Sequence, residues 1–169
     1  MASIIKANQL QDFGGNSIIT SDGAGNLTTQ KTNYPAFRVT EGNQSLSNDI
    51  STKLQFNTID YDTDSAFDTT NYRFIVPSGK SGKYYFESYI SIPGIDSGEF
   101  GQNWIKLNDT TNINIIREHM SGPNQFYRQI TSTTLNLNVG DFVEAYAYQN
   151  SGGSQTAATI YFSGYRIGS

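Results

Sequence analysis

The most constraining feature of this sequence is a two-residue alternation of apolar and polar side chains. In the segment 83–92, one face of the alternation carries Tyr84, Phe86, Ile90 and Ile92. In the segment 141–148, one face carries Val143, Ala145 and Ala147, and the other carries Phe142, Glu144, Tyr146 and Tyr148. Because successive side chains of a strand point to opposite faces of a sheet, this pattern predicts half-buried β-strands. No window of useful length keeps the 3.6-residue period of a helix.

Further strands are expected where similar short apolar runs occur, at 35–40, 53–59, 71–76, 103–107, 112–118, 126–139 and 158–167. Turn residues separate these runs, as in Gly42-Asn43, Ser78–Gly82 and Pro93-Gly94. Asn, Ser and Thr are abundant, and their side chains compete for backbone hydrogen bonds and so disfavour helix interiors. We therefore expect an all-β sandwich or jelly roll.

Charge and composition exclude several classes of partner. The net charge is −4 and no basic patch is visible, so a nucleic acid partner is not expected. The sequence has no Cys, which excludes disulfides and thiolate metal sites. No segment approaches the roughly 20 apolar residues of a membrane span, and Met-Ala-Ser-Ile-Ile-Lys lacks the apolar stretch of a signal peptide. We expect a protein made in a cytosol, without membrane insertion.

Residues 1–33 differ from the rest of the chain and are interpreted as an N-terminal arm, followed by one domain over 34–169. The arm has tight-turn chemistry at Gly14–Asn16 and Ser21–Asn26, with short extended pieces between. Its apolar residues are too few for a core of their own: Ile4, Ile5, Leu10, Phe13, Ile18, Ile19 and Leu27. We expect them to anchor the arm on another polypeptide, whereas a disordered tail is the alternative.

Residues 34–169 resemble the globular head of complement component 1q, a family that shares its fold with tumour necrosis factor. The resemblance runs through Pro35-Ala36-Phe37, then Phe56, Asp62, Phe67 and Phe74, then Gly82-Lys83-Tyr84-Tyr85-Phe86, Leu135–Val143 and Phe162-Ser163-Gly164-Tyr165. The loop between Phe74 and Gly82 is longer than the family pattern, and Ser88 stands where that pattern has an aromatic residue. The resemblance implies a ten-stranded jelly-roll sandwich, preceded here by the extended arm, and a homotrimer.

The arm is similar to the opening of virion structural and tail-fibre proteins of tailed phages, through Ile4–Asp12 and Gly15–Ile19. The two resemblances together imply a virion protein bound by its arm to capsid or tail proteins. A capsid decoration or cement protein is the first interpretation, and a short tail fibre that binds a host receptor is the second. A soluble module that binds a glycan or a protein is an alternative of another class.

No arrangement of residues indicates catalysis or a cofactor. His119 is the only histidine, so a His-rich metal site is excluded and a surface or loop histidine is expected. The Gly-Lys-Ser of the 78–82 turn lacks the remaining glycine of a phosphate loop, so a polar turn is expected there. Trp104 could form a carbohydrate-stacking platform or lie in a core. Asp60, Asp62 and Asp64 offer alternate carboxylates for a cation, although the flanking residues do not complete a calcium loop. We expect no catalytic residue and no metal.

The subunit interface of the expected trimer is assigned to aromatic residues of the late strands. Tyr146, Tyr148, Tyr161 and Tyr165 are large apolar groups at alternate positions of 141–148 and 158–167. Exposed together as a patch, they would favour association. We therefore expect these four side chains at the contact between subunits.

Overall fold

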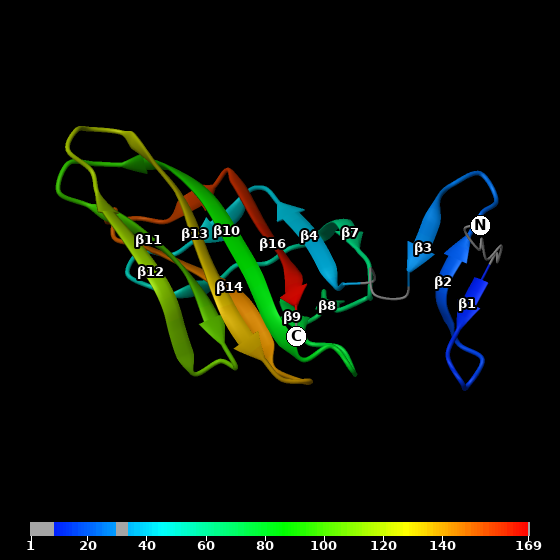
Figure 1. Ribbon diagram of the computed structural model, residues 1–169. Coiled ribbons are helices and arrows are strands. Elements are labelled where there is room, and N and C mark those ends of the chain that lie inside the picture. The colour runs from blue at the N-terminus through cyan, green and yellow to red at the C-terminus, as the bar shows by residue number, and fades with distance from the viewer. Residues whose placement is uncertain (1–8, 30–33, 169) are drawn as a thin grey trace. The chain divides into compact units, whose positions relative to one another are not determined.

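The computed structural model describes residues 9–29 and 34–168, and all regular structure in these residues is β-strand. The chain divides into two units, residues 1–34 and 35–169, one residue from the boundary expected from sequence. Figure 1 shows the smaller unit as β1 to β3 and the larger as the remaining strands. No helix capable of crossing a membrane occurs in the part of the chain that the structure describes.

The first unit is a small antiparallel meander of β1 (Gln9–Gln11), β2 (Ser17–Ser21) and β3 (Leu27–Thr29). Its two turns are organised by aspartates. The Asp12 carboxylate accepts from the Asn16 backbone N–H at 2.8 Å, and the Asp22 carboxylate accepts from the Ala24 N–H at 2.7 Å. Such local side-chain bonds are the usual reason that Asp is favoured in turns. The expected extended pieces and tight turns are therefore present.

The second unit is a jelly roll of two large antiparallel sheets, in the orders β13-β10-β16-β4-β7 and β12-β11-β14-β9-β8, with β6 also paired to β14. A separate ladder joins β15 to β5. The strand bounds are β4 Ala36–Glu41, β5 Gln44–Leu46, β6 Thr52–Lys53, β7 Thr58–Asp62, β8 Phe67–Asp68, β9 Arg73–Ile75, β10 Gly82–Ile95, β11 Phe100–Leu107, β12 Thr111–His119, β13 Gln125–Leu137, β14 Phe142–Gln149, β15 Gln155–Ala157 and β16 Thr159–Gly168.

The long strand β10 sets the two ends of the jelly roll. At its beginning, Tyr85 pairs with Tyr165, which in turn pairs with Ala36, so the unit's first strand and its C-terminus lie together. At its finish, Ile95 pairs with Gln125 after a bulge at Pro93 and Gly94, where Gly94 adopts a φ of 70°. We refer to this second end, which carries the β10–β11 and β12–β13 loops, as the far end.

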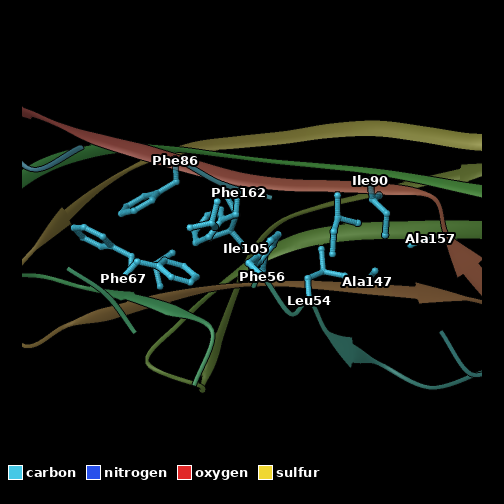
Figure 2. Close-up of a cluster of buried hydrophobic side chains, with 14 of the residues drawn as sticks. Leu54, Phe56, Phe67, Phe86, Ile90, Ile105, Ala147, Ala157 and Phe162 are labelled. Carbon is cyan, nitrogen blue, oxygen red and sulfur yellow. The ribbon is translucent and has the colours of Figure 1, made fainter. Parts of the chain in front are cut away.

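The core lies between the two sheets and is aromatic at its centre. Phe37 is fully buried and stacks on Phe74 at 4.9 Å between ring centroids, while its ring meets Phe162 edge-on at 5.1 Å. Figure 2 shows Phe67, Phe86 and other buried side chains filling the same space. Such aromatic pairs contribute about 0.5–1.5 kcal/mol each beyond the burial of their area.

Strand boundaries differ from the sequence prediction where a segment changes sheet. The expected strand at 53–59 is two strands, β6 in one sheet and β7 in the other. Leu54 and Phe56 lie between them and are fully buried, so the apolar run marks a core crossing instead of one strand. The two large sheets also hold more strands than the ten expected, because sheet edges are built from short pieces such as β8 and β9. Their few residues carry no periodic signal.

Candidate interaction surfaces

The outer face of the five-stranded sheet carries a cluster of tyrosines around one carboxylate. Tyr85 and Tyr89 on β10 lie beside Tyr165 and Tyr161 on β16, at ring-centroid distances of 5.4 and 5.2 Å. Glu87 lies between the two pairs and accepts from the Tyr161 hydroxyl at 2.8 Å and from the Tyr85 hydroxyl at 3.0 Å. We call these five residues the tyrosine face. Because the alternate residues of β10 fill the core, this face points away from it.

Charged groups stabilise the arrangement of the tyrosine face. Burial, followed by the hydrogen bond to Glu87, raises the pKa of Tyr161 to about 12, so its hydroxyl stays a donor. The guanidinium of Arg38 lies 4.4 Å from the centre of the Tyr161 ring and pairs with Asp60 at 3.1 Å. Around this cluster, Tyr61, Ile130 and Ile167 are each about half exposed. The face is thus an aromatic surface joined by internal hydrogen bonds and ring contacts, with an apolar margin.

Tyr146 and Tyr148 do not belong to this face. Both lie on β14 in the six-stranded sheet, where Tyr146 stacks on Trp104 at 5.6 Å and Tyr148 stacks on Phe100 at 5.5 Å. Tyr161 and Tyr165 lie on β16 in the other sheet. The four tyrosines predicted for a subunit contact therefore cover two separate surfaces and do not form one patch, because β14 and β16 belong to different sheets.

Trp104 is not available as a stacking platform. Its side chain is only 5% exposed, its ring is covered by Tyr146, and its Nε1–H donates to the Asn112 side chain at 3.1 Å. Lys106 lies 4.8 Å from the centre of the Tyr146 ring and bonds Asp109 at 2.6 Å. The side chains around Trp104 therefore cover its ring and leave no open aromatic face for a sugar.

The three candidate cation ligands are engaged separately. Asp60 pairs with Arg38, and the Asp62 carboxylate accepts from the backbone N–H groups of Ala66 and Phe67 at 3.0 and 2.8 Å. Asp64 accepts from the Thr63 hydroxyl at 3.0 Å. Over the described ranges 9–29 and 34–168, no group of three or more His, Cys, Asp or Glu side chains is arranged to hold a metal ion. The carboxylates organise a strand and a turn instead.

His119 lies at the surface and the segment 78–82 forms a turn, as the sequence predicts. His119 is exposed at the end of β12, with its ring 4.9 Å from that of Phe100. The Lys80 backbone N–H donates to the Pro77 carbonyl at 3.1 Å, and Gly79 has a φ of 73°. The segment 78–82 is therefore a turn between β9 and β10, and no helix follows it to bind a phosphate.

The arm exposes most of its apolar side chains. Leu10 pairs with Ile19, and Leu27 pairs with Ser21, so these residues share one side of the small sheet. Leu10 is 56% exposed and Leu27 is 67% exposed; Phe13 and Ile18 are also exposed and Ile19 is half-buried. Ile4 and Ile5, the other predicted anchoring residues, lie outside the described residues. The unit has an apolar side that it cannot cover itself.

The jelly roll and its arrangement correspond to one family of known domains. The family model described as "C1q domain" matches residues 36–167. The chain belongs to the C1q domain family. Among solved structures, the zebrafish complement 1qA globular domain superposes with a TM-score of 0.62 at 20% identity, over 80% of this chain and 98% of that chain. No curated protein sequence matches the chain significantly.

A second solved structure has the same fold in a different setting. The PRD1 vertex protein P5 superposes with a TM-score of 0.58 at 13% identity, over 79% of this chain and 97% of that chain. At such identities both likenesses carry the fold alone. The C1q domain of this chain thus provides a jelly roll whose surfaces must be interpreted from its own residues.

Sequence reasoning missed three of the five residues of the tyrosine face of this C1q domain. Tyr85, Glu87 and Tyr89 occupy the alternate positions of the segment 83–92, opposite the apolar residues that were assigned to the core. The same alternation would have placed them on one outer surface. What it could not show is that β10 lies next to β16, which brings Tyr161 and Tyr165 to that surface.

Proposed function

We propose that this protein is a non-enzymatic structural component of a phage particle, in which the C1q domain forms a homotrimer and the arm attaches it to the particle. Capsid decoration or cementing is the role that we favour. The observation that carries the proposal is the tyrosine face: four tyrosines, a carboxylate satisfied from within, and a half-exposed apolar margin. Tyr165 is 50% exposed and the other three tyrosines are partly exposed. A contiguous surface of such groups is typical of a protein interface.

The chemistry of the tyrosine face suits association with copies of itself. Tyrosines supply large contact area at low cost in side-chain entropy, and their rings are already held by stacking. Glu87 has both oxygens engaged by tyrosine hydroxyls, so burial against a second subunit would not leave it without hydrogen bonds. We therefore keep Tyr161 and Tyr165 in the proposed subunit interface and add Tyr85 and Tyr89 in place of Tyr146 and Tyr148.

The arm supports attachment to a partner by the same reasoning. Its three short strands leave Leu10 and Leu27 exposed on one side of the sheet, and β1 and β3 are the edge strands of that sheet. An edge strand presents backbone groups to which another chain can add a strand. A partner can cover the apolar side, or it can add a strand to an edge. A capsid or tail protein of the particle is the partner we propose, and the fold shared with a protein named for the PRD1 vertex is consistent with that setting.

The trimer is tested by placing a charge on the margin of the tyrosine face. Ile130→Lys should convert the trimer to a monomer in light scattering, because Ile130 is 48% exposed and pairs with Tyr89. Ile115→Lys is the matched control, since Ile115 is 51% exposed but lies on β12 in the other sheet. A parent protein that is monomeric at micromolar concentration, or a loss of trimer in the control alone, would refute this interface.

The particle role is tested by deleting residues 1–33. The shortened protein should remain a folded trimer and no longer join the particle, and electron microscopy of the complete particle should locate the protein on the head. Location at the tail would favour the short tail fibre that binds a host receptor. A full-length protein absent from purified particles would favour the soluble glycan- or protein-binding module.

A further inference from the structure

The far end of the jelly roll contains a cavity of about 360 Å³ in the hairpin between β12 and β13. The turn beside it is held by Gln125, whose side-chain oxygen accepts from the backbone N–H groups of Ser121 and Gly122, both at 3.1 Å. Met120, at the base of the turn, is nearly buried and exchanges backbone bonds with the 98–99 turn. The cavity is therefore built on a fixed hairpin, and its size suits one or two sugar rings.

Two side chains give this cavity its chemistry. Phe126 is 48% exposed, and the guanidinium of Arg128 lies 4.2 Å from the centre of its ring. Among the described residues no carboxylate lies within ion-pair distance of Arg128, whereas Arg38, Lys53 and Arg73 all have such partners. The guanidinium thus retains its capacity to bind a carboxylate through two parallel hydrogen bonds.

The remaining wall of the cavity is polar and already oriented. Glu118 accepts from the Gln129 side chain at 2.5 Å, which fixes one carboxylate oxygen and leaves the other for a ligand donor. Ser121 adds a hydroxyl at the mouth of the cavity. An aromatic ring, a free guanidinium, and acceptors for hydroxyl groups are together the set that binds a sugar carrying a carboxylate.

We propose that this cavity binds a carboxylate-bearing sugar, with Arg128 on the carboxylate, Phe126 against the ring and Glu118 accepting from hydroxyl groups. The position of the cavity fits such a role. Along β10, the cavity lies beside Ile95, whereas the strand that follows the arm pairs with β16 at Tyr165, whose partner on β10 is Tyr85. At about 3.3 Å per residue, Tyr85 and Ile95 are separated by at most about 33 Å. Its use in contacting a host surface, but not the binding itself, rests on the proposed attachment through the arm.

Binding is tested by titrating the full-length protein with sodium glucuronate and, separately, with glucose, followed by amide chemical shifts. Glucuronate should shift the amides of 118–128 and should bind at least about tenfold more tightly than glucose, the difference expected for a charge-assisted pair. The two sugars differ only at C6, where glucuronate has a carboxylate and glucose a hydroxymethyl group, so equal affinities would overturn the proposal. Absence of shifts at 118–128 with glucuronate would overturn it as well.

Variants assign the effect to the guanidinium. Arg128→Gln should weaken glucuronate binding about tenfold relative to the parent protein. Arg128→Lys should show most of the same weakening, because a lysine cannot bind a carboxylate bidentately. Arg117→Gln is the matched control: Arg117 also lies over an aromatic ring, 4.4 Å from the centre of Phe100, but is outside the cavity. Equal loss in both variants would overturn the assignment. If the full-length protein forms a trimer and joins the particle normally but does not bind glucuronate, that result contradicts only this inference and not the proposed function.

Discussion

The two units of this chain use the same strand chemistry with different outcomes. In the C1q domain, Phe37, Val39, Phe86 and Phe162 are fully buried, because a second sheet covers the first. In the arm, the strands β1 to β3 alternate in a similar way, yet Leu10 and Leu27 remain more than half exposed. Alternation therefore makes a strand, but only a covering layer makes a core. The arm is held together by its turns, and the domain by its interior.

The largest contrast is expected from truncation of a core ring. Phe37→Ala removes a side chain that contacts the rings of Phe67, Phe74, Phe86 and Phe162, and it should lower the free energy of unfolding by about 3–5 kcal/mol. Urea unfolding followed by tryptophan fluorescence measures this change. Leu27→Ala in the arm is the comparison and should leave the same transition in place. A loss below about 1 kcal/mol for Phe37→Ala would mean that the aromatic cluster is not the centre of the core.

A smaller effect is expected from adding a methyl group between the sheet and its core. At Gly164, a Cβ would lie 2.6 Å from the Phe86 ring and 2.9 Å from the Tyr85 carbonyl oxygen, so Gly164→Ala should cost about 1–3 kcal/mol. Gly168 is on the same strand with nothing within 4 Å of its Cβ position, and Gly168→Ala should be close to neutral. Thermal unfolding of the two variants makes the comparison. Equal unfolding midpoints would show that the neighbouring core side chains move aside to accommodate a methyl group at Gly164.

Acid should affect the arm locally. Hydrogen bonds from the Asn16 side chain and backbone lower the pKa of Asp12, and those from the Asn26 side chain and the Ala24 backbone lower that of Asp22, each from an ordinary value of 3.8. Because these pKa values are depressed in the fold, the stabilisation is present above pH 3.8 and is lost as the pH falls through the lower folded values.

Amide exchange of Asn16 and Ala24 should accordingly become less protected at a pH well below 3.8. Asp12→Asn and Asp22→Asn together should remove most of this pH dependence, since neither turn then has a carboxylate to titrate. Protection that persists unchanged in acid would show that the turns do not depend on the ionised aspartates.

The smallest effect concerns the coupling between the units. Deletion of residues 1–33 should change the free energy of unfolding of the C1q domain by less than about 0.5 kcal/mol, because the buried core residues that the structure describes all lie beyond Tyr34. The shortened and complete proteins are compared by urea unfolding at the same subunit concentration. A larger destabilisation would mean that the arm completes the domain, and the boundary near Tyr34 would have to move.

The sequence by itself determined the strands, because the period of two is a local property that each segment carries. The face of β10 that holds Tyr84, Phe86, Ile90 and Ile92 was predicted and is buried. The C1q domain family was also predicted from the sequence, because its motifs recur in order from Pro35 to Tyr165. Short edge strands such as β8 were not predicted, since a strand of two residues cannot show a period.

Only the tertiary structure decided which surfaces these strands form together. Tyr146 and Tyr161 read alike in sequence, but β14 joins the six-stranded sheet and β16 the five-stranded one. Tyr85 meets Tyr165 across 80 residues of chain for the same reason. Arg128 likewise lies over the Phe126 ring, without an ion pair to a carboxylate in the part of the chain that the structure describes. Sheet pairing is a long-range choice, made by the burial of all the strands at once, and no single segment contains it.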